Sequence, residues 1–268
     1  TQALVAGALV LRGQANSESG GAYQLWREAL RPFVLAAQPA NDEAAVLQMA
    51  VPDIATLLGR TLPPAPTLEP KAAQARLLAT LTALVRREAE HQPLVFVFED
   101  LQWIDENSIE LLQHLNRQPG PRRVLIVGSY RLDEAPQLPA RLPLMKPLRL
   151  GRLPADQIAH LSEAMLGSGG RRTHLVNFLQ QETEGNTFFM VEVLRTLAEE
   201  VGRLDRISDM ALPLHVFAGG MQQMVQRRLQ RVPIIYQPLL QLAAVAGRQL
   251  DLAVLQYLDP HANLDEWL

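Results

Sequence analysis

The sequence contains no cysteine, which excludes disulfide bonds, thiolate metal sites and a cysteine nucleophile. It also lacks any apolar run near the roughly 18 residues that a membrane-spanning helix needs, and it shows no signal peptide. The formal net charge is only -3, so overall charge gives no reason to expect binding to nucleic acid or membranes. We therefore expect a soluble, cytoplasmic protein.

Lysine is scarce as well, because only Lys71 and Lys146 occur among the 25 basic residues. A phosphate-binding P-loop has the motif G-x-x-x-x-G-K-[ST], in which backbone amides hold the phosphates and the lysine neutralises their charge. Lys71 follows Pro70 and Lys146 follows Met145, so neither lysine stands in such a motif. The sequence as given has no P-loop.

The 268 residues, 48% of them apolar, suffice for one large domain or for a medium domain with a small one. A short apolar run at 9–13, ended by Gly13, predicts a buried strand, and the apolar runs at 94–98 and 124–127 predict buried strands of a parallel sheet. A helical pattern over 109–115, capped by Asp105 or Asn107, separates the last two strands and makes a βαβ unit.

Helical periodicity predicts most of the remaining elements. One helix begins near Leu25 and stops at Pro32, and a long one lies between Pro70 and Pro93. A weak strand is predicted at 147–150. Further helices are predicted at 158–166, 171–182, 187–201, 221–229, 238–246 and 252–258. The first half is therefore α/β and the second half helical.

An acidic pair, Glu99 and Asp100, directly follows the apolar strand at 94–98. Ligands of open α/β sheets bind at the carboxyl ends of the strands. One carboxylate there can hold Mg²⁺ while its neighbour orients an attacking water. An ordinary polar strand end at the surface explains the same residues, so the motif alone leaves both interpretations open.

Two further segments carry polar groups that can serve a nucleotide. Ser129 and Arg131 follow the strand at 124–127, where they can sense a γ-phosphate by hydrogen bond and by charge. Gly185 and Asn186 precede the helix at 187–201, and backbone amides at a helix start can meet an anion. A solvated strand-to-loop turn and an ordinary capped helix remain the simpler alternatives.

In this order and spacing, the segments resemble the AAA+-like ATPase module of the STAND class of signal-transduction ATPases. That family shows an apolar strand, an acidic pair and Leu-x-Trp-x-Asp, and residues 99–105 read Glu-Asp-Leu-Gln-Trp-Ile-Asp. The resemblance spans essentially the whole chain, with further matches at 10–13, 23–30, 128–131, 150–153, 185–189, 227–229 and 243–248.

The resemblance implies a role for each matching residue. Glu99 takes the place of the Mg²⁺-associated acid, and Asp100 takes that of the acid that polarises water and also contacts the metal. Ser129 and Arg131 belong to the sensor strand, Arg131 with a catalytic role. Gly185 and Asn186 belong to the segment that closes over ATP. The chain departs from the family in two residues, since Thr187 replaces a proline and the first acid is Glu rather than Asp.

The resemblance also implies a P-loop NTPase-like parallel sheet without its first strand and P-loop. It divides the chain into an α/β nucleotide-binding core at 1–150, a helical lid-like subdomain at 151–210 and a partial winged-helix-like domain at 211–268. Because the sequence begins in the middle of an apolar pattern, we expect the P-loop to lie upstream, so that this chain alone binds ATP poorly.

Two functions follow as hypotheses. In the first, the chain is part of a switch that binds and hydrolyses ATP with Mg²⁺ and controls output or repeat domains of a larger regulator, such as a regulator of transcription. In the second, it is a nucleotide-independent scaffold or DNA-binding segment built on a degenerate ATPase fold. The expected partners are the missing P-loop segment and the C-terminal domains of the same polypeptide. Self-association and DNA binding are further candidate interactions, and no membrane contact is expected.

Overall fold

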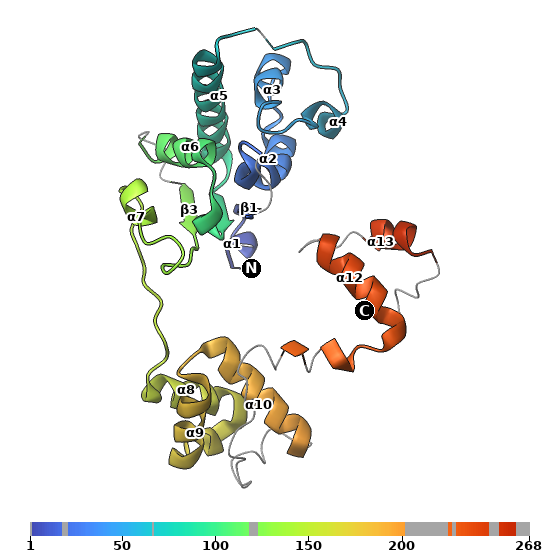
Figure 1. Ribbon diagram of the computed structural model, residues 1–268. Helices are drawn as coiled ribbons and strands as arrows, with labels where there is room; N and C mark the ends of the chain where they lie inside the picture. The colour runs from blue at the N-terminus through green and yellow to red at the C-terminus, as the bar shows by residue number, and fades with distance from the viewer. Residues whose placement is uncertain are drawn as a thin grey trace. The chain divides into compact units, whose positions relative to one another are not determined.

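The computed structural model describes residues 2–17, 21–65, 67–117, 123–201, 225–226, 229–246 and 252–260. The chain forms two compact units, Thr1–Leu148 and Arg149–Leu268 (Figure 1). Each unit has its own hydrophobic core. No helix in the described part of the chain is long and apolar enough to cross a membrane.

The first unit contains a parallel three-stranded sheet. Its strands are β1 (Leu9–Gln14), β2 (Leu94–Glu99) and β3 (Val124–Gly128), with β2 in the centre. The predicted strands and the α/β class are therefore confirmed. The prediction that β3 is buried is wrong, because β3 is an edge strand of the described sheet and its residues are half-buried or exposed. The strand predicted at 147–150 is wrong, because Pro147 has no N–H to donate and Leu148 and Leu150 are exposed to solvent.

In the first unit, one short helix precedes β1, and the other described helices lie between the strands or follow β3. Their bounds are α1 (Gln2–Val5), α2 (Gln24–Ala37), α3 (Asn41–Leu47), α4 (Ile54–Leu58), α5 (Pro70–His91), the 3-10 helix η1 (Leu101–Trp103), α6 (Glu106–Arg117) and α7 (Leu138–Arg141). The prediction that the helix near Leu25 stops at Pro32 is wrong, since α2 continues to Ala37. Beyond the proline, Phe33 and Val34 are fully buried, and their packing offsets the hydrogen bond that Pro32 cannot donate.

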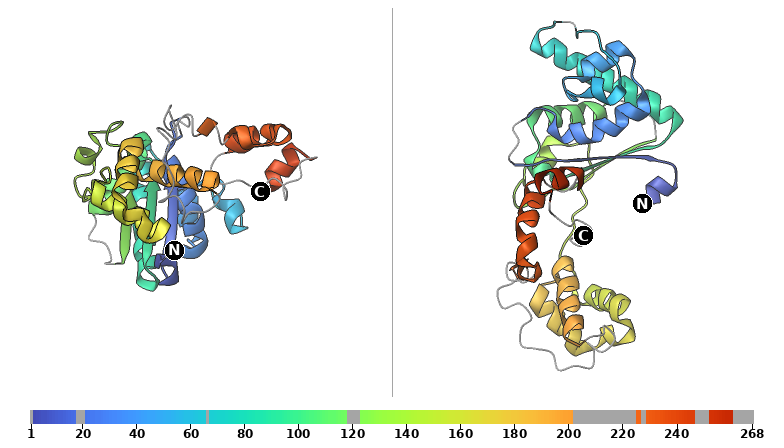
Figure 2. Two further views of the ribbon diagram at one scale, coloured as in Figure 1. Left: turned by 90° about the horizontal axis from the view of Figure 1, so that it is seen from below. Right: turned by 90° about the vertical axis from the view of Figure 1, so that its right-hand side faces the viewer.

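The two faces of the sheet differ in burial. On one face, Leu11, Phe96 and Phe98 are fully buried in the core. Figure 2 shows α2, α5 and α6 on this side of the sheet. Trp26 of α2 is also fully buried, and its ring meets Phe98 edge-on with the ring centroids 4.6 Å apart. These aromatic rings form the centre of the core directly beneath the end of β2.

The other face carries the alternate residues of the strands, and they are less buried. Register and alternation place on it Val10, Arg12, Val95, Val97, Leu125 and Val127. Leu125 and Val127, on the edge strand β3, are 55% and 46% exposed. Parallel sheets are usually covered on both faces, so this apolar face is unusually open for a parallel sheet.

The second unit is helical. Its described elements are α8 (Ala155–Leu166), the 3-10 helix η2 (Gly167–Arg171), α9 (Thr173–Thr183), α10 (Thr187–Val201), the 3-10 helix η4 (Ile234–Tyr236), α12 (Gln237–Ala246) and α13 (Leu252–Leu258). The helices predicted for these regions are confirmed. Most of the helix predicted at 221–229 lies outside the described residues, as do large parts of the winged-helix-like domain expected at 211–268.

Candidate functional site

The acidic pair lies at the carboxyl end of the central strand. Glu99 is the last residue of β2, and Asp100 follows it with a left-handed backbone, φ 58° and ψ 40°. This conformation is costly for most residues, but the short side chain of aspartate tolerates it. Both residues are half-buried. The backbone therefore favours Asp at position 100 and turns the chain sharply into η1.

Two glutamine amides hold the Asp100 carboxylate. Gln14 Nε2 donates to Oδ2 at 2.7 Å, and Gln102 Nε2 donates to Oδ1 at 3.2 Å. Sequence reasoning did not single out either glutamine. A signal was nevertheless present, because Gln14 ends the strand beside β2 and lies in register with Glu99. Polar residues that end adjacent parallel strands meet at one edge of the sheet.

Ser129 lies beside the acidic pair, as its place after the neighbouring strand predicts. Its N–H donates to the Phe98 carbonyl at 2.9 Å, and its carbonyl accepts the Leu101 N–H at 2.9 Å. These bonds tie the ends of β2 and β3 together on either side of the two carboxylates. Ser129 is exposed and available to a ligand that binds at this edge.

Arg131 follows Ser129 but is not aimed at the acids. Its guanidinium pairs with Glu134 at 2.9 Å, and the Arg131 side chain is 65% exposed. Its backbone N–H donates to Gln102 Oε1 at 3.2 Å. An ion pair at such exposure is weak, at most about 1 kcal/mol, so the guanidinium can leave Glu134 for a stronger anion.

Asp105, the last residue of the Leu-x-Trp-x-Asp segment, is a helix cap. Its Oδ1 accepts the Ser108 N–H at 3.0 Å and the Tyr23 N–H at 3.4 Å, and its Oδ2 accepts the Ser108 hydroxyl at 2.5 Å. Asp105, not Asn107, therefore caps α6, and it also ties the start of α2 to that helix. This carboxylate is committed to structure rather than to a ligand.

Tyr23 gives this junction a pH dependence at alkaline pH. Burial, followed by the nearby Glu110 and Asp105 carboxylates, raises the pKa of its hydroxyl above the ordinary 10.0, and a hydrogen bond with Gln74 opposes the rise. The folded protein thus holds this proton more tightly than the unfolded chain does. Its contribution to stability is complete below about pH 10 and is lost as the pH rises through the folded pKa.

Above about pH 10, we accordingly expect the free energy of unfolding of Tyr23→Phe to fall less steeply with rising pH than that of the wild type. The reason is that phenylalanine has no proton to lose. Urea unfolding at a series of alkaline pH values measures the slope. The same comparison near neutral pH, well below the ordinary pKa of 10.0, is the control and should show equal slopes for the two proteins. At alkaline pH, equal slopes for wild type and Tyr23→Phe would contradict the assignment.

Gly185 and Asn186 belong to the second unit. Gly185 has φ +73°, and a Cβ there would lie 2.3 Å from the Leu153 carbonyl oxygen. Its own carbonyl accepts the Leu153 N–H at 2.8 Å. Asn186 Oδ1 accepts the Phe189 N–H at 3.2 Å and so caps α10. Both residues have structural tasks here, and their role toward a nucleotide stays a prediction.

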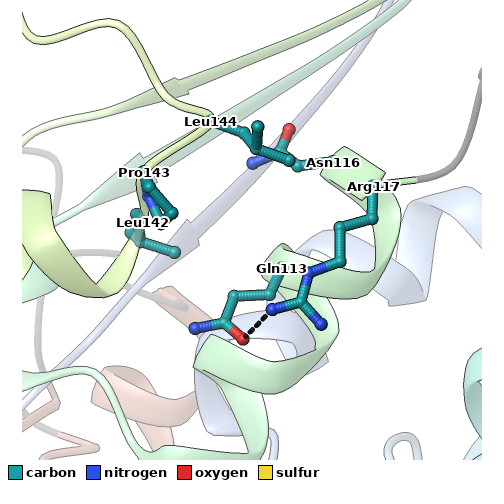
Figure 3. Close-up of a pocket in the computed structure, with 6 residues that line it drawn as sticks. All are labelled: Gln113, Asn116, Arg117, Leu142, Pro143 and Leu144. Atoms are coloured by element: carbon teal, nitrogen blue, oxygen red, sulfur yellow. Dashed lines mark hydrogen bonds between the residues drawn. The ribbon is translucent and has the colours of Figure 1, made fainter.

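The first unit contains a pocket (Figure 3). It is lined by Gln113, Asn116 and Arg117 of α6 and by 142–144. Figure 3 shows Arg117 reaching back toward Gln113, whose Oε1 accepts a hydrogen bond from Arg117 Nη2 at 3.3 Å. Neither carboxylate of the acidic pair lines this pocket, so it is not the site predicted from the sequence.

The donor set at the strand end suits a magnesium ion that arrives with phosphate. Mg²⁺ usually takes one or two carboxylates and completes its shell with water and phosphate oxygens. Glu99 and Asp100 supply such a pair. Each oxygen of the Asp100 carboxylate keeps a second lone pair besides the one that accepts a hydrogen bond from a glutamine amide. Within the described ranges, no group of three or more His, Asp or Glu side chains could hold a metal by itself.

The first unit also matches a known family. Residues 1–127 match the family model of the AAA ATPase domain. The match supports an AAA+-like ATPase module in this part of the chain, and such modules use a nucleotide and Mg²⁺ in general. It includes the acidic pair and ends within β3, just before Ser129. Comparison with curated proteins and with solved structures gave no match.

Proposed function

We propose that this chain is most of a STAND-type ATPase switch, in which Glu99 and Asp100 act on Mg·ATP bound by a P-loop outside the given sequence. The observation that carries the proposal is the Asp100 carboxylate, held by two amides at the carboxyl end of a central parallel strand. The AAA ATPase match over residues 1–127 supports it independently.

The exposed edge and face of the sheet are consistent with a further strand and helix that would pack there in a longer polypeptide. β3 is an edge strand, and the half-exposed Leu125 and Val127 belong to an apolar face that no helix of the first unit is seen to cover among the described residues. A strand beside β3 and a helix over that face would complete a doubly covered parallel sheet. A P-loop joins a strand to a helix, so a segment of that kind has the required shape.

Within this proposal each site residue has a task. Glu99 holds the metal together with Asp100, and Asp100 orients the attacking water. Ser129 reads the γ-phosphate, and Arg131 exchanges Glu134 for phosphate charge. Gly185 and Asn186 belong to the unit whose arrangement the nucleotide state sets. That unit, with the winged-helix-like region, passes the state to an output domain.

Calorimetry with Mg·ATP tests the proposal on this chain and on a longer polypeptide in which a P-loop precedes residue 1. We expect binding and hydrolysis by the longer polypeptide only. There, Asp100→Asn should lower kcat at least about 100-fold, because the water loses its base while the left-handed backbone is tolerated.

Glu106→Gln is the matched control, since Glu106 is an exposed acid that pairs with Arg141 on α7. It should leave both ATP binding and kcat unchanged. Absence of ATP binding in the longer polypeptide would sink the ATPase proposal. It would leave the scaffold or DNA-binding segment as the function of this fold.

A further inference from the structure

We propose that Gln102 is a positioning residue that couples the Asp100 carboxylate to the segment carrying Arg131. Its consequence for catalysis rests on the proposed function, but the coupling itself is a property of this chain. The side chain forms a bridge, because Nε2 donates to Asp100 Oδ1 and Oε1 accepts the Arg131 N–H, both at 3.2 Å.

The bridge requires a side chain that both donates and accepts a hydrogen bond. A carboxamide carries a donor and an acceptor at one end, whereas an ionised carboxylate only accepts and an ammonium only donates. The left-handed turn at Asp100 brings the side chain two residues later back to the carboxylate. Gln102 therefore meets both the acid and the exit of the neighbouring strand.

Backbone hydrogen bonds hold the main chain on either side of the bridge. The part of the bridge that can move is therefore the Gln102 side chain. Ser129 bonds to Phe98 and Leu101, and the Trp103 N–H donates to the Asp100 carbonyl at 3.0 Å. A shift of the Asp100 carboxylate, as on meeting a cation or water, changes the partner of Gln102 Nε2. The hydrogen bond from the Arg131 N–H to Gln102 Oε1 then changes as well. This bond lies at the start of the turn in which Arg131 pairs with Glu134.

Hydrogen exchange of the Arg131 amide, measured by NMR on this chain, tests the coupling without nucleotide. Asp100→Gly removes the carboxylate and keeps a residue that accepts the left-handed backbone. We expect it to speed Arg131 exchange about threefold, the order of one weakened hydrogen bond. In a Gln102→Ala background, where the bridge is already gone, Asp100→Gly should add nothing.

Gln113→Ala is the matched control, because Gln113 is also part-buried but donates to the Arg141 carbonyl at 2.7 Å. It should leave Arg131 exchange at the wild-type rate. An equal effect of Asp100→Gly with and without Gln102, or no effect in either background, would overturn the coupling. A general loss of structure would instead speed exchange at amides throughout the sheet.

Kinetics of the longer, ATP-binding polypeptide test the catalytic consequence. Gln102→Ala and the isosteric Gln102→Glu, which cannot donate to Asp100, should each lower kcat about tenfold with KM for ATP unchanged. A normal kcat in both variants would overturn the positioning role and leave the ATPase proposal standing. Failure to bind ATP would count against the proposed function alone, because the exchange experiment decides the coupling independently.

Discussion

Trp26→Ala is expected to lower the free energy of unfolding of the first unit by about 3–5 kcal/mol. Trp26 is fully buried and contacts Phe96 and Phe98, with ring centroids 5.7 and 4.6 Å away. Its indole N–H donates to the Ser108 carbonyl at 3.3 Å. Alanine leaves a large cavity beneath the sheet and removes the donor for a buried carbonyl.

Urea unfolding followed by far-ultraviolet circular dichroism measures the loss. Trp103→Ala is the matched control, since Trp103 is 41% exposed on η1, and we expect it to cost less than about 1 kcal/mol. A loss below about 1 kcal/mol for Trp26→Ala would show that this ring is not the centre of the core. The variant should also loosen the strand end, because Phe98 directly precedes Glu99.

Gly185→Ala is expected to destabilise the second unit by about 3 kcal/mol. A methyl group there meets the Leu153 backbone oxygen at 2.3 Å, and an L-residue is strained at φ +73°. The backbone at position 185 and at Leu153 must move apart. This movement disrupts the Leu153–Gly185 hydrogen bond and the start of α10. Both effects act in the same direction.

Gly59→Ala separates the two contributions. Gly59 has a left-handed backbone, with φ 63° and ψ 32°, but a Cβ there meets no atom within 4 Å. This variant should cost the first unit only about 1–2 kcal/mol, the strain of the left-handed backbone. Mass-spectrometric hydrogen exchange over α9 and α10 reports on the second unit, and exchange over α2 and α5 reports on the first. Equal losses at the two glycines would mean that the contact with Leu153 contributes nothing.

The strands were predictable because strands of parallel sheets often form continuous apolar runs, a pattern that 94–98 and 124–127 show. The burial expected from this pattern did not follow for β3, which is an edge strand of the described sheet. The short helices α3, α4 and α7 were not predicted, since helices of their length depend on packing rather than on local propensity. The end of α2 was misjudged at Pro32 for a related reason, because buried side chains beyond it outweigh a local signal.

The site was predictable in part. Acids and Ser129 follow neighbouring parallel strands, and chain order alone brings such positions to one edge of a sheet. The partners of Asp100 depend on two things that the sequence pattern does not show, the register of β1 against β2 and the left-handed turn. The sequence predicts that Arg131 follows β3. Its ion pair with Glu134 depends on side-chain geometry, which the sequence pattern does not show.

The order of the strands has a consequence for how the site assembles during folding. Leu94 pairs with Val124 across the short β2–α6–β3 segment, but it pairs with Leu9 across most of the first unit. Closing the longer loop costs more chain entropy, so β1 joins last unless its helices dock early. The link from Gln102 to Arg131 can therefore form in an intermediate that lacks β1, whereas the bond from Gln14 to Asp100 marks the completed fold.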